Sequence, residues 1–182
     1  MDETVEYQLQ AIGHYKSKQV HPYEAGRQPD PTHQQGLIEL APGHNFEQAL
    51  IGLEKGQMIW VLFIFHHNQN WKPMVLPPRG GNQKVGVFAT RSPYRPNQIG
   101  MSAVRILDIQ GLKIFVEGAD LLDQTPIVDI KPYLSYADSH EGETPAWLKN
   151  TPHFEVNWSP QAEKHWDFLQ DKVPNLRSFI LH

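Results

Sequence analysis

MIWVLFIFH, residues 58–66, is the stretch that decides the fold class. It is rich in β-branched and aromatic residues, which favour a strand, and apolar side chains fall on both of its faces. Such a strand is expected in the centre of a sheet. Outward from it, the same composition and turn residues predict further strands over residues 5–15, 36–40, 84–90, 103–109, 113–118 and 125–130.

Turns and helix signals complete the pattern. Gln110-Gly111 separates two of the predicted strands as a hairpin turn. Asn45 is expected to cap a short helix over residues 46–55, and Ser159-Pro160 to open a second helix that ends near residue 172. Many short strands between turn residues predict a mainly β protein with a few short helices, and a barrel rather than β-α-β units.

Composition excludes several classes of protein. The chain has 182 residues and no cysteine, so disulfides, thiolate nucleophiles and zinc-thiolate sites are excluded. Its longest apolar run is far shorter than the roughly 20 residues of a membrane span, and residues 1–10 lack the features of a secretion signal. We therefore expect a cytoplasmic protein without a membrane partner.

Charge is distributed unevenly along the chain. The net charge is −4, yet residues 72–105 contain six basic residues and no acidic one, whereas residues 106–143 contain eight acids. A basic block in an acidic chain indicates either a local contact with a phosphate-bearing partner or a solvated face.

GVFATRSPYRPNQIG, residues 86–100, places two arginines among two prolines. Proline fixes its own φ and restricts the residue before it, so this loop is expected to be stiff. Arg91 and Arg95 offer paired donors to phosphate or carboxylate, and Asn97 suits a base edge. Gly100 allows close backbone approach. The alternative is a structural turn whose arginines pair with nearby acids.

A second cluster lies in residues 118–133. Asp120 and Asp123 precede a strand, and Asp129 and Lys131 share one face of it, as an acid–base pair or as a simple ion pair. Tyr133 is either a stacking partner for a base or part of the core rim.

A metal site is not expected. His66 and His67 are adjacent, and neighbours on a strand point to opposite faces, so they are poorly placed to share an ion. The sequence also lacks the glycine-rich motifs of Rossmann and P-loop nucleotide sites.

Five segments in fixed order resemble one family. They are GRQP (26–29), IWVLF (59–63), FHH (65–67), PPRGGNQKVGVFATRSPYRPNQIGMS (77–102) and GADLLDQTPIVDIKPYLSYADS (118–139). Together they resemble the TrmO or TsaA-like family of S-adenosylmethionine-dependent tRNA methyltransferases, from about Ile12 to Ser139.

The resemblance implies a single-sheet β-barrel over residues 1–139, followed by a linker and C-terminal helix over 140–182 that starts a small further domain. It implies a homodimer with its site near the subunit interface, and tRNA carrying threonylcarbamoyladenosine as substrate.

The resemblance also implies roles for individual residues. S-adenosyl-L-methionine would contact residues in five segments: Gln28, Pro29, Asp30, Pro31, His66, His67, Arg91, Met101, Leu122, Asp123, Gln124 and Thr125. Arg95, Asn97 and Lys131 would contact RNA, and Lys131 and Tyr133 are the candidate catalytic residues. No general base is identified.

The sequence departs from the family pattern at three sites. Asp30-Pro31 stands where a glycine is usual, Gln98 replaces a proline, and Gln124 replaces a glycine in a turn expected near the cofactor. Two other readings stay open: a non-catalytic barrel that binds RNA or a nucleotide, and a methyltransferase with a different acceptor.

Overall fold

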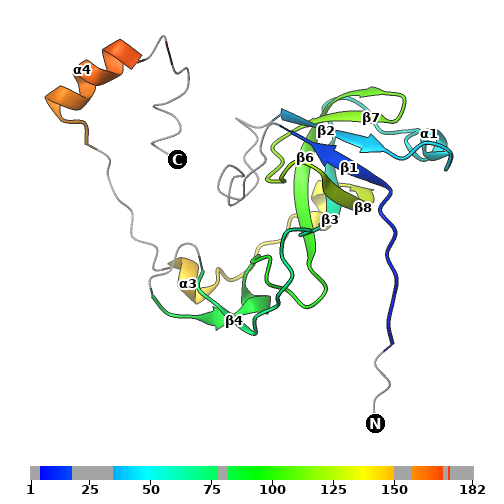
Figure 1. The fold of residues 1–182 in the computed structure, drawn as a ribbon, viewed down its shortest axis with the longest axis horizontal. Helices are drawn as coiled ribbons and strands as arrows, with labels where there is room; N and C mark the ends of the chain where they lie inside the picture. Colours follow the sequence, from blue (N-terminus) through cyan, green and yellow to red (C-terminus); the bar gives the residue numbers. More distant parts are fainter. Residues whose placement is uncertain (1–4, 18–34, 78–81, 150–156, 170–171, 173–182) are drawn as a thin grey trace. The chain divides into compact units, whose positions relative to one another are not determined.

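Six antiparallel strands form a closed barrel, in the order β1-β2-β7-β6-β3-β8 (Figure 1). The computed structural model describes residues 5–17, 35–77, 82–149, 157–169 and 172. The barrel strands are β1 (Gly13–Lys16), β2 (Gln35–Leu40), β3 (Met58–Ile64), β6 (Ile99–Gln110), β7 (Lys113–Glu117) and β8 (Thr125–Pro132). The mainly β fold and the single closed barrel are confirmed.

The other elements are short. They are α1 (Phe46–Ala49), the two-stranded sheet of β4 (Met74–Val75) and β5 (Val85–Gly86), the 3₁₀ turn η1 (Val87–Ala89), α2 (Ser135–Asp138), α3 (Ala146–Lys149) and α4 (Pro160–Leu169). Contacts divide the chain into two compact units, Met1–Lys149 and Asn150–His182. Within the described residues, no helix is both long and apolar enough to span a bilayer.

The core fills the barrel interior. In β3 every second residue is buried, so Ile59, Val61 and Phe63 point inward. Each buried side chain of this size contributes about 1.5–3 kcal/mol relative to exposure. The other face of β3 is also apolar and only half-buried, in agreement with the two-sided apolar pattern of the sequence.

Several elements differ from the sequence prediction, among them β6, which begins at Ile99 rather than at residue 103. The first strand begins at Gly13 rather than at residue 5. The helix predicted over 46–55 stops at Ala49, because Gly52 and Gly56 adopt left-handed φ values of 95° and 89°. Asn45 is itself left-handed, at φ 59°, and makes no side-chain cap.

The strand predicted over 84–90 ends at Gly86. The next residues turn, because the backbone N–H of Thr90 donates to the Val87 carbonyl at 3.1 Å and its hydroxyl donates to the same oxygen at 2.9 Å. Local side-chain bonds of this kind compete with sheet pairing.

Two predicted local signals are present in the structure. Gln110 pairs with Lys113 across a hairpin whose Gly111 has φ 58°. At the start of α4, the Ala162 N–H donates to the Ser159 hydroxyl at 3.2 Å, as expected of an N-cap.

Candidate cofactor and RNA site

One end of the barrel, called here the Ser17 end, gathers most of the candidate residues. β1 and β3 end there, and β6 and β8 begin there: Tyr15 pairs with Thr125, and Ile64 pairs with Ile99. His66 and His67 follow β3, and the 120–124 turn precedes β8. The strand register therefore brings residues from separate segments to one place.

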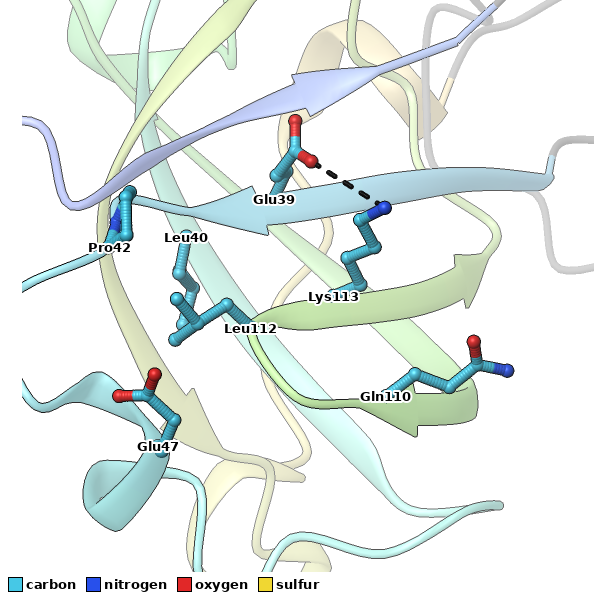
Figure 2. A pocket seen from close by; sticks show the side chains of 7 residues that line it. All are labelled: Glu39, Leu40, Pro42, Glu47, Gln110, Leu112 and Lys113. Atoms are coloured by element: carbon cyan, nitrogen blue, oxygen red, sulfur yellow. Dashed lines mark ion pairs between the residues drawn. The ribbon is translucent and has the colours of Figure 1, made fainter.

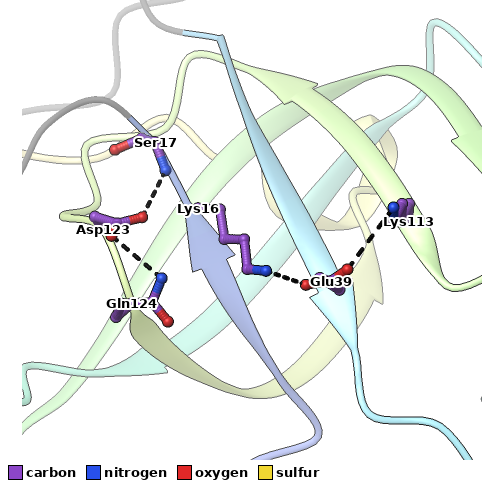
Figure 3. A network of polar contacts seen from close by, with 6 residues as sticks. All are labelled: Lys16, Ser17, Glu39, Lys113, Asp123 and Gln124. Atoms are coloured by element: carbon purple, nitrogen blue, oxygen red, sulfur yellow. Dashed lines mark hydrogen bonds and ion pairs between the residues drawn. The ribbon is translucent and has the colours of Figure 1, made fainter.

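Asp123 is the polar centre of the turn at this end (Figure 3). Its Oδ1 accepts from the Ser17 backbone N–H at 3.0 Å, and its Oδ2 accepts from the Gln124 side-chain amide at 3.2 Å. These hydrogen bonds, led by the one from Ser17, lower the pKa of Asp123. The group is therefore a carboxylate at neutral pH and can accept hydrogen bonds or face a positive charge.

Gln124 occupies a left-handed backbone conformation, with φ 60°. Its N–H donates to the Tyr15 carbonyl at 2.7 Å, so the turn is tied to β1. Glycine, which the family resemblance leads us to expect here, adopts this conformation without the cost that a side chain adds.

We expect Gln124→Gly to raise the free energy of unfolding by about 1 kcal/mol, because it relieves the left-handed strain. For a chain of this size that corresponds to a rise in melting temperature of about 2–4 °C. Gln110→Gly is the matched control, since Gln110 also bonds a nearby aspartate, Asp108, but lies in a strand. The control should lower the melting temperature; a fall with both variants would contradict the strain at Gln124.

His66 and His67 lie against each other, with ring centroids 4.0 Å apart. The expectation that they point to opposite faces is wrong, because β3 ends at Ile64 and the two histidines sit in a turn. Burial is the main cause of a lowered pKa at His66, and the neighbouring His67 lowers that pKa further. The negative charge of Asp123 raises it, but by less. The His66 ring is therefore neutral at pH 7.

A buried polar cluster lies between β1, β6 and the 120–124 turn. The Ser102 hydroxyl donates to Asp120, and burial raises the pKa of Asp120 against the opposing effects of Ser102 and the Arg91 charge. Tyr15 is fully buried, and its hydroxyl has no hydrogen-bond partner among the described residues. Burial, helped by Asp120, raises the pKa of Tyr15 to about 12.

Hydrogen bonds tie the 91–100 loop to the residues before it. Nη1 of Arg95 donates to the Thr90 carbonyl at 2.8 Å and, at 3.4 Å, to that of Val87, so part of this guanidinium stabilises the loop. Arg91 and Asn97 are exposed. Gly100 faces the ring of Phe63, which a side chain at this position would overlap.

Gln98 is a second left-handed residue, with φ 53°. A proline cannot adopt this φ, so the proline that the family resemblance leads us to expect here would not fit this backbone.

Lys131 and Tyr133 lie toward the opposite end of the barrel. Lys131 pairs with Trp60 near the start of β3, and the rise of β8 separates Lys131 from Thr125 by roughly 20 Å. Lys131 forms an exposed ion pair with Asp129 at 2.8 Å, as one of the two sequence readings expected. Within one chain, these residues are not brought to the Ser17 end.

The remaining candidates are placed as follows. Met101 is 48% exposed and points outward from β6, and Leu122 and Thr125 flank the Asp123 turn, with the Thr125 hydroxyl donating to the Leu122 carbonyl at 2.8 Å. Gln28, Pro29, Asp30 and Pro31 lie outside the described residues.

A groove of about 590 Å³ lies where β2 and β6 end and β7 begins, which is the end of the barrel opposite Ser17. Figure 2 shows the side chains that line it. Glu39 and Glu47 line it, and its single lysine, Lys113, is 3.9 Å from Glu39. An acidic lining with a paired lysine does not suit a phosphate ligand, so the Ser17 end is the better candidate for the RNA-modifying site. Within the described part of the chain, no group of three or more metal-ligating side chains is close enough to hold an ion.

The sequence alone gave no role to Tyr15 and Ser102. Both are buried, 0% and 1% exposed; Ser102 donates to Asp120, and the charge of Asp120 helps to raise the pKa of Tyr15. For Ser102, the only signal in the sequence was a polar residue directly before a predicted strand, at the spacing of its inward-facing positions. Its partner could not be identified without the barrel register.

Residues 13–139 match the family described as tRNA-methyltransferase O N-terminal domain. The chain is 36% identical over 184 residues to the tRNA (adenine(37)-N6)-methyltransferase of Escherichia coli (strain K12), covering 96% of this chain and 78% of that protein. It is 40% identical over 180 residues to the putative S-adenosylmethionine-dependent methyltransferase RcsF of Pseudomonas aeruginosa, covering 93% and 78%. The crystal structure of TrmO from Pseudomonas aeruginosa superposes with a TM-score of 0.69 at 35% identity, over 92% of this chain and 77% of that one.

Proposed function

Since this chain belongs to the tRNA-methyltransferase O N-terminal domain family, we propose that it methylates the exocyclic nitrogen of adenine 37 in tRNA, using S-adenosylmethionine. The observation that carries the proposal is the convergence of Asp123, His66 and the Arg91 loop at the Ser17 end of the barrel.

The donor set at the Ser17 end fits S-adenosylmethionine chemically. Asp123 is ionised and accepts hydrogen bonds, so it suits ribose hydroxyls or the ammonium group. Arg91 supplies a cation for the carboxylate, and neutral His66 adds a donor or acceptor without charge. The bound cofactor supplies an electrophilic methyl group on its sulfonium. The chain's own task is to orient it against the acceptor nitrogen.

The finer proposal is that the acceptor is threonylcarbamoyladenosine. The modified nitrogen belongs to a urea-like group and is more acidic than an ordinary exocyclic amine, so a strong general base is unnecessary. This agrees with the site, where the described groups near Asp123 would hold and orient the cofactor rather than remove a proton.

A homodimer is part of the proposal, because within one chain Lys131 and Tyr133 lie at the opposite end of the barrel from Asp123. The outward residues of β3 between the two ends, Trp60, Leu62 and Ile64, are apolar, whereas outward positions of an antiparallel sheet are commonly polar. Met101, opposite Leu62, extends this face and is 48% exposed. A second copy packed on this face would bury it and bring its own Lys131 near the Ser17 end.

Calorimetric titration with S-adenosylmethionine tests the proposal first. We expect saturable binding near one site per chain, weakened at least tenfold by Arg91→Ala, because that variant removes the cation and leaves Asp120 without its opposing charge. Arg105→Ala is the matched control, since Arg105 pairs with Glu117 on the barrel wall. Binding that is absent, or equally weak in both variants, would overturn the cofactor assignment.

The acceptor is tested with tRNA that carries or lacks the threonylcarbamoyl group. Methylation of the modified tRNA alone supports threonylcarbamoyladenosine. Equal methylation of both tRNAs would support a tRNA methyltransferase but exclude threonylcarbamoyladenosine as its specific acceptor. RNA binding without methylated product would favour a non-catalytic barrel.

A further inference from the structure

A second pocket lies beside the β4–β5 sheet, outside the Ser17 end. It has a volume of about 270 Å³ and is called here the ribbon pocket. Its lining combines two lysines, one tyrosine, one serine and apolar side chains, principally Lys72, Lys84, Tyr94, Ser92, Met74 and Leu76. This mixture of cations, an aromatic ring and apolar surface differs from the acidic lining of the groove in Figure 2.

The charge of the ribbon pocket is positive and is not neutralised locally. None of its lining residues is acidic. Neither Lys72 nor Lys84 forms an ion pair with any carboxylate of the described residues, and the whole stretch 72–105 lacks an acid. Lysines without a carboxylate partner attract phosphate groups and make the resulting affinity depend on salt.

Tyr94 provides the stacking surface. The Lys72 ammonium lies 4.2 Å from the centre of the Tyr94 ring, so a cation already sits against the aromatic face. Neighbouring apolar side chains are solvent-accessible, with Met74 48% and Leu76 54% exposed. An unpaired nucleotide offers both groups that such a surface binds: a base that stacks and a phosphate that a lysine contacts.

Hydrogen bonds tie together the segments that line the ribbon pocket. The Lys72 N–H donates to the Tyr94 carbonyl at 3.0 Å, and the Asn68 side-chain amide donates to the Pro93 carbonyl at 2.6 Å. A third bond, from the Val87 N–H to the Pro73 carbonyl at 3.0 Å, anchors the other side. A preformed pocket loses less conformational entropy on binding. The 91–100 loop contributes Ser92 and Tyr94 to the pocket and also carries Arg91 and Arg95. The ribbon pocket is therefore adjacent in sequence to the proposed cofactor site.

We propose that the ribbon pocket binds a single-stranded nucleotide that flanks the methylated adenine, with the base on Tyr94 and its phosphates at Lys72 and Lys84. The assignment rests on the proposed function, because it takes the ligand to be a segment of the tRNA loop. It adds a specificity-determining contact outside the residues that hold the cofactor.

The test measures the dissociation constant of the full chain for an anticodon stem-loop RNA, by fluorescence anisotropy at several salt concentrations. The Lys72→Ala/Lys84→Ala variant is expected to weaken binding about tenfold and to reduce the slope of log K against log salt by about 1.4, or roughly 0.7 for each phosphate contact. Lys113→Ala/Lys149→Ala is the control with the same loss of charge, since these lysines pair with Glu39 and Glu143. It should leave the slope nearly unchanged.

A second pair of variants separates stacking from charge. Tyr94→Phe should retain the affinity, and Tyr94→Ala should lose it, while both keep the backbone bond from Lys72. Equal effects of the two lysine pairs, or full affinity in Tyr94→Ala, would overturn the pocket assignment. Competition by poly-glutamate as strong as that by RNA would also overturn it.

These readouts are independent of the proposed function. S-adenosylmethionine binding, measured by calorimetry, should be the same in all four variants and wild type. If the Lys72→Ala/Lys84→Ala variant methylates tRNA normally and binds RNA with unaltered affinity, the ribbon-pocket assignment is wrong and the enzyme assignment stands. Absence of methylation in the wild-type protein removes the enzyme assignment, while the RNA titration still decides the pocket.

Discussion

Mixing two inactive variants, Arg91→Ala and Lys131→Ala, is expected to restore about one quarter of wild-type methyltransferase activity, as random pairing in a symmetric dimer requires. Each variant alone should lose activity at least a hundredfold. In a mixed dimer, one site carries both substitutions and the other carries neither. The measurement is methyl incorporation into tRNA after the two purified variants are exchanged and re-equilibrated.

The prediction depends on the separation of the two groups of residues. Arg91 acts at the Ser17 end, where its charge opposes the raised pKa of Asp120. Lys131 lies six residues along β8 from Thr125, about 20 Å by the rise of a strand. A side chain cannot cover that distance, so a shared catalytic role requires Lys131 of another copy.

The control is a mixture of Arg91→Ala with the Arg91→Ala/Lys131→Ala double variant, which has no intact site in any pairing and should stay inactive. If the first mixture also stays inactive while both variants form dimers, the shared site is wrong. Full activity of Lys131→Ala alone would show that Lys131 serves only its ion pair with Asp129.

Local patterns in the sequence were sufficient for most of the barrel. The two-sided apolar pattern of β3, the Gln110-Gly111 turn and the Ser159 cap each depend on residues that are close in sequence, and all three are present. The short helix α1 was overestimated because Gly52 and Gly56 end it by their left-handed φ values, which override the apolar spacing.

The site was less predictable, because its contacts join distant segments. Ser17 is bonded to Asp123 across 106 residues, and Ser102 of β6 is bonded to Asp120 in the turn between β7 and β8. No spacing rule gives such pairs. The contact of His66 with His67 was also missed, since it depends on where β3 ends, and strand ends are set by tertiary pairing rather than by composition.

Close packing of the barrel accounts for the glycine at position 100. The sequence suggested that this glycine allows backbone approach, and the structure shows the ring of Phe63 in that space. Glycines that face neighbouring strands therefore belong to the packing of this barrel. Substituting them is expected to lower the free energy of unfolding, and to affect the site only through that loss of stability.

Gly13→Ala is expected to lower the free energy of unfolding by about 1–3 kcal/mol, the usual cost of overpacking a core. Gly13 is buried in β1 between Leu40 and Ile127. A methyl group there would overlap the Glu39 carbonyl oxygen and approach the Leu40 Cα to 2.8 Å. These are backbone atoms, so relief requires β1 and β2 to separate, and not merely a side chain to rotate.

Thermal and urea unfolding of Gly13→Ala and Gly86→Ala would measure the difference. Gly86 is also a strand residue, but a methyl group there meets no atom within 4 Å, and its φ of −57° suits alanine. The control should therefore be neutral or slightly stabilising, since alanine restricts the unfolded chain. Because β1 carries Ser17 to Asp123, a strained β1 should also weaken S-adenosylmethionine binding. Equal unfolding midpoints for the two variants would mean that β1 and β2 do not pack in the register seen here.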